Sequence, residues 1–183
     1  MITAAPGTLL IADPFLKDPN FMRTVVCLCE HQKEGSFGFV LNKKYEETID
    51  QLITDLEGFK IPVYYGGPVQ QDTIHFLHQY PDIIPDSIKV TDDIYWGGNF
   101  ETLSALIKTN GIDLSKIKFF IGYSGWSEGQ LSEELKEKSW ITSPASRNLI
   151  FDISFTDVWK ESLRSLGGDY ELLVNSPIDP QLN

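Results

Sequence analysis

Hydrophobic residues occur mainly in short runs whose length and composition predict β-strands. Such runs cover residues 7–12, 22–30, 36–42, 61–65, 73–79, 117–123 and 148–153, and a shorter run at 87–90 continues toward 95–98. Gly35 separates the second run from the third, so these two are predicted to pair as an antiparallel hairpin. Two glycines and a proline at positions 66–68 end the fourth run and predict a loop.

The spacing of apolar residues changes to that of one helix face in three other stretches, residues 46–57, 99–108 and 156–166. Gly58 follows the first stretch and suits the left-handed position after a last helical turn. Asn99 and Thr156 begin the other two stretches, where their side chains can cap the free amides of a first turn. Gly167 is expected to end the last helix.

The stretch 122–140 combines three glycines with three large aromatic residues. It is predicted to be the end of a strand, a sharp glycine-rich turn and a short acidic helix. Ser127 with Gln130 three residues later has the spacing of a capping box, which places the start of the helix at Ser127. Glu134 and Lys138 are spaced to form an ion pair on the surface of that helix.

The order of these elements predicts an α+β architecture, because the first strands are linked by a hairpin and the helices do not alternate regularly with strands. The 183 residues fit one domain, and a hydrophobic content of 42% is that of a globular protein with a buried core. The end of the chain contains two prolines and few apolar residues, so residues 175–183 are expected to be a loosely held tail.

The chain is strongly acidic, with 15 Lys and Arg residues against 26 Asp and Glu residues and a net charge of -11. Such a field repels nucleic-acid phosphates and anionic lipids, so binding to either through bulk charge is not expected. No apolar run approaches the roughly 18 residues of a membrane span, and the first residues lack the basic segment of a signal peptide. These features predict a cytoplasmic protein.

Several short motifs, none specific alone, resemble one family in their joint order and spacing. They are Leu-Leu-Ile-Ala-Asp-Pro at 9–14, Glu30-His31, Gly-Ser-Phe-Gly-Phe-Val-Leu-Asn at 35–42, Gly-Gly-Pro-Val at 66–69, His78 and the stretch 122–140. Together they resemble the bacterial AlgH-like (YqgE) family over residues 9–166. Asp13 departs from the family pattern, which commonly has an apolar residue there, and Cys27 and Cys29 lie outside the shared pattern.

The resemblance implies a single cytosolic domain built on a small closed or barrel-like, mostly antiparallel sheet surrounded by about four helices. Some family members carry a regulatory label linked to exopolysaccharide genes, which implies a transcriptional role without a recognisable DNA-binding motif. The resemblance implies no defined reaction.

Cys27, Cys29 and His31 would share one face of a regular strand, an arrangement that a soft metal could use. A structural zinc site, however, needs four ligands and usually takes them from turns. Two small buried hydrophobic residues and a histidine at the strand end are therefore the favoured interpretation, and no metal or cofactor is predicted.

Glu30 and His31 place a carboxylate beside an imidazole, and His78 on another strand could meet them to form an acid–base pair. Adjacent strand residues point to opposite faces, which favours a structural role for Glu30. The sequence around Ser124 misses the nucleophile elbow of hydrolases, because its second glycine comes one residue early. An enzyme using Glu30, His31 and His78 is thus an alternative hypothesis.

The glycines of the stretch 122–140 also permit a shallow binding groove, because backbone without a side chain allows close approach. The candidate groove residues are Asn42, Gly66, Gly67, Pro68, Tyr123, Gly125, Trp126, Gly129, Gln130 and Trp140. The competing interpretation is that the two tryptophans are core residues at the ends of the helix.

The function predicted first is a non-catalytic cytosolic binding or regulatory protein whose partner is a protein or a small molecule. A DNA-binding transcriptional regulator is the least favoured alternative because of the negative charge.

Overall fold

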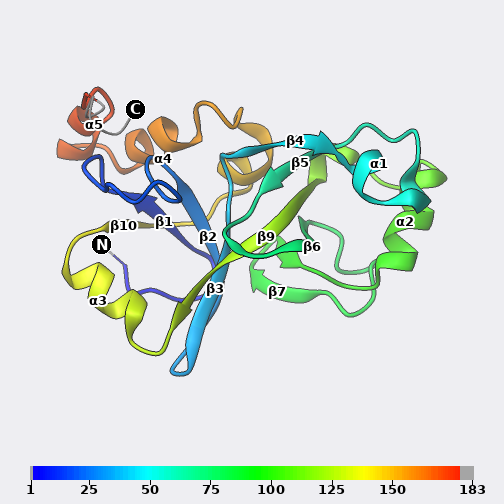
Figure 1. The fold of residues 1–183 in the computed structure, drawn as a ribbon, viewed down its shortest axis with the longest axis horizontal. Helices are drawn as coiled ribbons and strands as arrows, with labels where there is room; N and C mark the ends of the chain where they lie inside the picture. Colours follow the sequence, from blue (N-terminus) through cyan, green and yellow to red (C-terminus); the bar gives the residue numbers. More distant parts are fainter. Residues whose placement is uncertain (1, 178–183) are drawn as a thin grey trace.

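The computed structural model describes residues 2–177, which form a single α+β domain with one curled, mostly antiparallel sheet and helices around it (Figure 1). Within these residues the main path of the sheet runs in the order β10-β1-β2-β3-β9-β6-β8-β7, and β4 and β5 pair beside it. The strands are β1 (Thr8–Ala12), β2 (Val25–Gln32), β3 (Gly35–Val40), β4 (Lys44–Thr48), β5 (Pro62–Tyr65), β6 (Val69–His78), β7 (Ile88–Thr91), β8 (Ile94–Trp96), β9 (Ile117–Ser127) and β10 (Trp140–Pro144). The sheet therefore curls into a half-barrel that begins at β10 and ends at β7.

The predicted hairpin of β2 and β3 is confirmed, and its strands are antiparallel. A bulge shifts their register between Leu28 and Glu30, so the side chains beyond the bulge no longer continue the alternation of the first half of β2. β1 pairs with β2 on one side and with β10 on the other. In Figure 1 this hairpin extends away from the body of the domain.

β9 is the central strand, since it pairs with β3 and β6 in antiparallel orientation and with β5 in parallel. It continues through residues 122–127, so the glycine-rich turn predicted in the stretch 122–140 comes later than expected, at Glu128 and Gly129 before α3. The β-forming aromatic residues at 123 and 126 keep the strand extended, and Gly122 with φ +70° bends it without ending it.

The prediction of one continuous helix over residues 46–57 is wrong. Residues 44–48 form β4, and only the single turn α1 (Ile49–Leu52) and the 3-10 turn η1 (Thr54–Leu56) follow. Ile49 and Leu56 are fully buried, as the apolar spacing predicted, but β4 pairs with β5 and extends the first residues of the stretch. The apolar spacing of residues 46–57 is compatible both with one helix and with a strand followed by two short helical turns.

The strand predicted for residues 148–153 is also wrong, because η3 (Asn148–Asp152) is one π-helical turn. Leu149 and Ile150 are buried from this turn, and a short apolar run cannot by itself distinguish a buried turn from a strand. The strand in this part of the chain is β10, which was not predicted.

The remaining helical elements are α2 (Phe100–Lys108), η2 (Leu114–Lys116), α3 (Gln130–Lys136), α4 (Val158–Leu166) and α5 (Asp169–Leu173). The predicted cap of α2 is confirmed, because the Asn99 side chain accepts a hydrogen bond from the Thr102 amide at 2.9 Å. The predicted caps of the two later helices are wrong. Gly129 caps α3 instead of Ser127, and Asp157 precedes α4 instead of Thr156.

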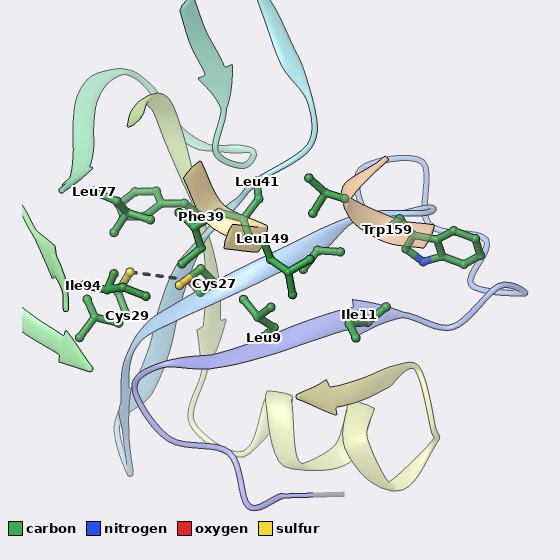
Figure 2. Close-up of a cluster of buried hydrophobic side chains, with 14 of the residues drawn as sticks. Leu9, Ile11, Cys27, Cys29, Phe39, Leu41, Leu77, Ile94, Leu149 and Trp159 are labelled. Carbon is green, nitrogen blue, oxygen red and sulfur yellow. Dashed lines mark hydrogen bonds between the residues drawn. The ribbon is translucent and has the colours of Figure 1, made fainter. Parts of the chain in front are cut away.

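The inner face of the half-barrel carries the largest hydrophobic cluster, part of which Figure 2 shows. Leu9, Cys27 and Phe39 from the sheet meet Leu149 from η3 in this cluster, and Trp159 from α4 lies at one side of it. The indole nitrogen of Trp159 donates to the Ala12 carbonyl at 2.9 Å, so α4 is fixed to β1 by a polar contact as well. A second cluster joins β5, β6 and β9 to α2.

The predicted tail, residues 175–183, is described only to residue 177, and residues 178–183 lie outside the described residues. Within the described part, the Arg23 guanidinium donates to the Ser176 carbonyl at 2.6 Å, which ties this segment to the body of the domain. No helix in residues 2–177 is both long and apolar enough to cross a membrane.

Candidate functional site

An open pocket of about 610 Å³ lies where β3, β6, β8 and β9 meet. We call it the aromatic pocket. It is lined by Glu30, Gln32, Glu34, Gly35, Ser36, Phe37, Val69, His75, Trp96, Tyr123, Gly125 and Trp126. A cavity of this size is within the range that proteins use for small ligands.

Phe37 lies at the centre of the rings that line the aromatic pocket. Its ring meets Trp96 edge to face with centroids 5.0 Å apart, and it meets Tyr123 in the same way at 5.9 Å. Gly125 is the partner of Phe37 across β3 and β9, so no side chain from that position covers the Phe37 ring. The three aromatic rings are only half-buried and are held in place by one another.

His75 on β6 supplies a polar group beside these rings. Thr73 donates its hydroxyl hydrogen to the Gln70 carbonyl at 2.7 Å, so its oxygen accepts from His75 Nε2–H at 2.9 Å. This assignment leaves Nδ1 of the neutral ring as an acceptor. Burial lowers the pKa of His75 below its ordinary value, which keeps the imidazole neutral at pH 7.

His75 was missed as a site residue, although the strand pattern contained the necessary signal. Alternation along β6 places His75 and Leu77 on one face and Phe76 and His78 on the other. His75 contacts Phe39 and Tyr123, with ring centroids 5.3 and 5.9 Å away. Knowing which face lined a pocket required the tertiary structure.

The rim of the aromatic pocket is acidic. Glu30 and Glu34 are exposed, and the Gln32 amide donates to a Glu30 carboxylate oxygen at 2.7 Å. The site therefore combines an apolar aromatic floor, one neutral acceptor and two carboxylates at its edge.

Of the groove residues predicted around the stretch 122–140, Tyr123, Gly125 and Trp126 line the aromatic pocket. The Trp126 ring, however, packs on the other face of the sheet, 6.2 Å from both Phe21 and Trp140. Trp140 is 1% exposed and belongs to the same cluster. Core packing thus accounts for the two tryptophan rings, and Tyr123 is the aromatic side chain that faces the pocket.

Glu134 on α3 accepts hydrogen bonds from the indole nitrogens of both tryptophans, at 3.1 Å from Trp126 and 2.9 Å from Trp140. Glu134 was predicted to pair with Lys138 on the surface, but its carboxylate instead binds the two indole groups between α3 and the sheet. The Gln130 side chain accepts from the Ser127 amide at 3.0 Å, which is one half of the predicted capping box.

The 66–68 loop and Asn42 lie outside the aromatic pocket. Gly66 and Gly67 pack directly on the backbone of β9, and the Ser124 hydroxyl donates to the Gly66 carbonyl at 2.9 Å. The Asn42 side chain accepts from the Val25 amide at 3.0 Å and donates to the Arg23 carbonyl at 2.9 Å. Pro68 is half-buried beside this packed loop, whereas Gly129 lines a separate hollow of about 390 Å³ that also contains His31.

The structure does not bring Glu30, His31 and His78 into one site. His31 Nδ1 lies 2.6 Å from the Ser36 hydroxyl, and Ser36 pairs with Trp126 near the end of β9. His78 pairs with Ile117 at the start of the same strand. The nine residue-to-residue steps from Ile117 to Trp126 correspond to roughly 30 Å of extended chain.

His78 is completely buried, and its ring nitrogens are used within the fold. Its Nδ1 accepts from the Tyr80 amide at 3.0 Å, so Nε2–H donates to the Gly97 carbonyl at 2.9 Å. Burial lowers the pKa of His78, which favours this neutral form, although the bond to Gly97 acts in the opposite direction.

Cys27 and Cys29 are free thiols in the hydrophobic cluster, and Figure 2 shows their sulfur atoms among apolar side chains. The Cys29 thiol donates to the Cys27 carbonyl at 3.6 Å, and burial raises the pKa of Cys29 well above its ordinary value. Within residues 2–177, no group of three or more His, Cys, Asp or Glu side chains is arranged to hold a metal ion.

The curled sheet with peripheral helices and one open aromatic pocket defines the chain as a single-domain α+β protein of half-barrel type. A family model described as AlgH-like matches residues 9–171, and the chain therefore belongs to the AlgH-like family.

Relatives from several bacteria carry the name UPF0301 protein. One from Chlorobium limicola is 45% identical over 178 residues, covering 97% of this chain and 95% of the relative, and one from Chlorobaculum tepidum is 46% identical with the same coverage. The solution structure of the AlgH protein from Pseudomonas aeruginosa is similar, with a TM-score of 0.76, 28% identity and coverage of 97% and 98%. A crystal structure from Corynebacterium diphtheriae matches with a TM-score of 0.81 at 22% identity, covering 96% and 94%, which supports the fold alone.

Proposed function

We propose that the protein is a non-catalytic binding protein whose ligand occupies the aromatic pocket. The observation that carries this proposal is the pocket of about 610 Å³ in which Phe37, Trp96 and Tyr123 remain half-buried beneath an acidic rim. Keeping large rings at a solvent-accessible surface leaves apolar area that a ligand would remove from water.

The chemistry of the pocket favours an organic cation with an apolar body. Aromatic faces attract ammonium and guanidinium groups by about 0.5–2 kcal/mol, and more strongly when water is excluded. Glu30 and Glu34 at the rim are negatively charged and attract a bound cation, and the net charge of -11 attracts cations at long range. The free Nδ1 of His75 would accept a hydrogen bond from an N–H group of the ligand.

A free amine and a basic side chain of a partner protein offer this same chemistry. The negative field disfavours DNA as a direct partner. Any effect of the protein on transcription would therefore be indirect, through binding another molecule in the cytoplasm. A binding role also agrees with the separation of His31 from His78, since neither completes an acid–base pair with the other.

The test uses benzyltrimethylammonium, with benzoate and benzyl alcohol as anionic and neutral probes of similar size, and follows amide shifts by ¹H–¹⁵N NMR. The cation is expected to shift β3, β6 and β9 residues around the aromatic pocket and to bind at least about 10-fold more tightly than benzoate. Replacing Tyr123 with Leu should weaken cation binding by about 10-fold, because a cation–π contact is lost.

Phe15→Leu provides the matched control, since Phe15 is 66% exposed and is not among the residues that line the aromatic pocket. Glu30→Gln combined with Glu34→Gln should weaken the cation and leave benzyl alcohol unchanged. Equal affinity for the three probes, or shifts that do not involve the aromatic pocket, would reject the proposal.

A further inference from the structure

Lys118 is a buried lysine on the central strand β9, five residues before Tyr123 of the aromatic pocket. It is 7% exposed, and alternation along β9 places it on the same side as Phe120, which belongs to the inner cluster. Fully buried lysines are rare unless they are paired, because an ammonium group loses its hydration.

Two groups lie directly at the Lys118 amine. Nζ donates to the Ile150 carbonyl of η3 at 3.1 Å, and it lies 4.1 Å from the centroid of the Tyr64 ring on β5. The ion pairs found within residues 2–177 do not include Lys118. The amine thus has a carbonyl and an aromatic face, with no carboxylate in ion-pair contact.

The other titratable or charged groups around Lys118 come from several elements. Cys27 on β2 acts on it electrostatically, and Asp152 on η3 and the exposed Lys60 before β5 line a pocket together with Lys118. Desolvation dominates over these groups and lowers the pKa of Lys118 from 10.5 to about 7. A large share of this amine is consequently uncharged near neutral pH.

Lys118 also forms part of the wall of a pocket of about 460 Å³, which we call the Lys118 pocket. Its lining consists of Lys60, Ile61, Pro62, Tyr64, Leu114, Ser115, Ile117, Lys118, Phe151, Asp152, Ile153, Ser154 and Phe155. Eight of these side chains are aliphatic or aromatic, and the other five are polar or charged. The lining suits a small molecule with an apolar body and one reactive polar group.

We propose that Lys118 is a covalent binding site, whose amine forms an imine with an aldehyde held in the Lys118 pocket. The nitrogen lone pair attacks the carbonyl carbon and forms a C–N bond, and proton transfer gives a carbinolamine. Loss of the hydroxyl group as water then forms the C=N bond. One amine and one aldehyde give one imine and one water, so no oxidant or reductant takes part.

A desolvated lysine is suited to this step because only the neutral amine is a nucleophile. At pH 7 an amine with a pKa of about 7 is half neutral, whereas an ordinary lysine at 10.5 is neutral to less than about one part in a thousand. This site is separate from the aromatic pocket, and the inference does not depend on the cation-binding function.

The test treats the folded protein with dilute benzaldehyde and sodium cyanoborohydride at pH 7, which reduces any imine to a stable benzyl-lysine, and locates the label by peptide mass spectrometry. The α-amine is scored separately, because it is weakly basic in any chain. Lys118 is expected to be labelled at least about 10-fold faster than any other lysine, and the preference should disappear when the protein is unfolded in urea.

Lys118→Met should abolish the selective label, while Lys116→Met, a change at an exposed lysine two residues away, should leave it intact. The wild-type map decides the question even if Lys118→Met does not fold. Labelling spread evenly over surface lysines, or confined to the α-amine with Lys118 unmodified, would overturn the proposal and leave Lys118 as a structural donor to η3.

Discussion

At the scale of single residues, the Glu134 carboxylate connects α3 to the sheet beneath it. It accepts from the indole nitrogens of Trp126 and Trp140, which are 5% and 1% exposed. Both tryptophans pack against Phe21, so one acceptor fixes a cluster of three rings. Buried N–H groups are costly when unpaired, and this makes Glu134 a stability residue instead of a surface charge.

Glu134→Ala is expected to destabilise the protein by about 2–3 kcal/mol, because two buried indole donors lose a charged acceptor. Urea unfolding followed by tryptophan fluorescence measures the change. Glu133→Ala is the control on the same helix, and it should cost about 0.5 kcal/mol or less, since Glu133 only forms an exposed ion pair with Lys136. Equal losses for the two variants would contradict this role for Glu134.

At the scale of elements, the close contact between the 66–68 loop and β9 fixes how the central strand is placed. A Cβ atom at Gly67, where φ is +153°, would lie 2.2 Å from the Tyr123 carbonyl carbon. One at Gly66 would lie 2.4 Å from the Gly122 carbonyl oxygen. The two backbones can approach this closely only because both positions lack side chains.

Gly67→Ala should therefore destabilise the protein by about 3 kcal/mol or more, because backbone atoms cannot move away cheaply. Gly125→Ala is the comparison, since a Cβ there would meet the Tyr123 ring at an ordinary 3.5 Å. We expect Gly125→Ala to change stability by less than about 1 kcal/mol. Thermal unfolding of the two variants tests the difference, and a tolerated Gly67→Ala would show that the contact is not needed.

The elements also show why the sequence predicted some segments and not others. The β2–β3 hairpin and α2 carry a turn residue or a cap together with a clear period, and both are present as predicted. Residues 44–48 contain one aromatic residue among polar ones, and residues 148–152 contain a short apolar run without a cap or turn residue of its own. Their structures depend on β4 pairing with β5 and on η3 packing over the sheet, which are contacts between distant parts of the chain.

At the scale of the whole molecule, buried bases make the stability of the fold depend on pH. His75 and His78 have pKa values lowered by burial, so the unfolded chain takes up their protons first when the pH falls below about 6.5. The folded state therefore loses stability on that side. Lys118 acts in the same direction at higher pH, because its pKa of about 7 in the folded state is below the ordinary 10.5.

Between pH 7.5 and 8.5, the unfolded chain still holds the Lys118 proton that the folded chain has largely released. The free energy of unfolding should thus rise by about 1 kcal/mol over this interval, within the limit of about 1.4 kcal/mol per proton and pH unit. Urea unfolding at the two pH values measures the rise. Lys118→Met should remove it and Lys116→Met should retain it, whereas an unchanged rise in Lys118→Met would show that other groups are responsible.

The interval stops at pH 8.5 because the Cys29 thiol has a pKa raised by burial and contributes with the opposite sign above about pH 9. Tyr64 and Tyr65 have pKa values raised by burial in the same way, and they act at still higher pH.

Local period, turn chemistry and composition were sufficient to predict the α+β class, the hairpin, the cap of α2, the family and the acidic charge. The sequence also indicated that Tyr123 and Gly125 belong to a binding surface, which we retain as part of the proposal. Which strand faces meet depends on tertiary contacts that the sequence pattern does not show. These contacts place His75 beside Tyr123, separate His31 from His78, and bury Lys118 beneath η3. Those placements arise from pairing between strands that are distant in the sequence. A one-residue bulge in such a strand changes the face of the sheet that the following side chains occupy.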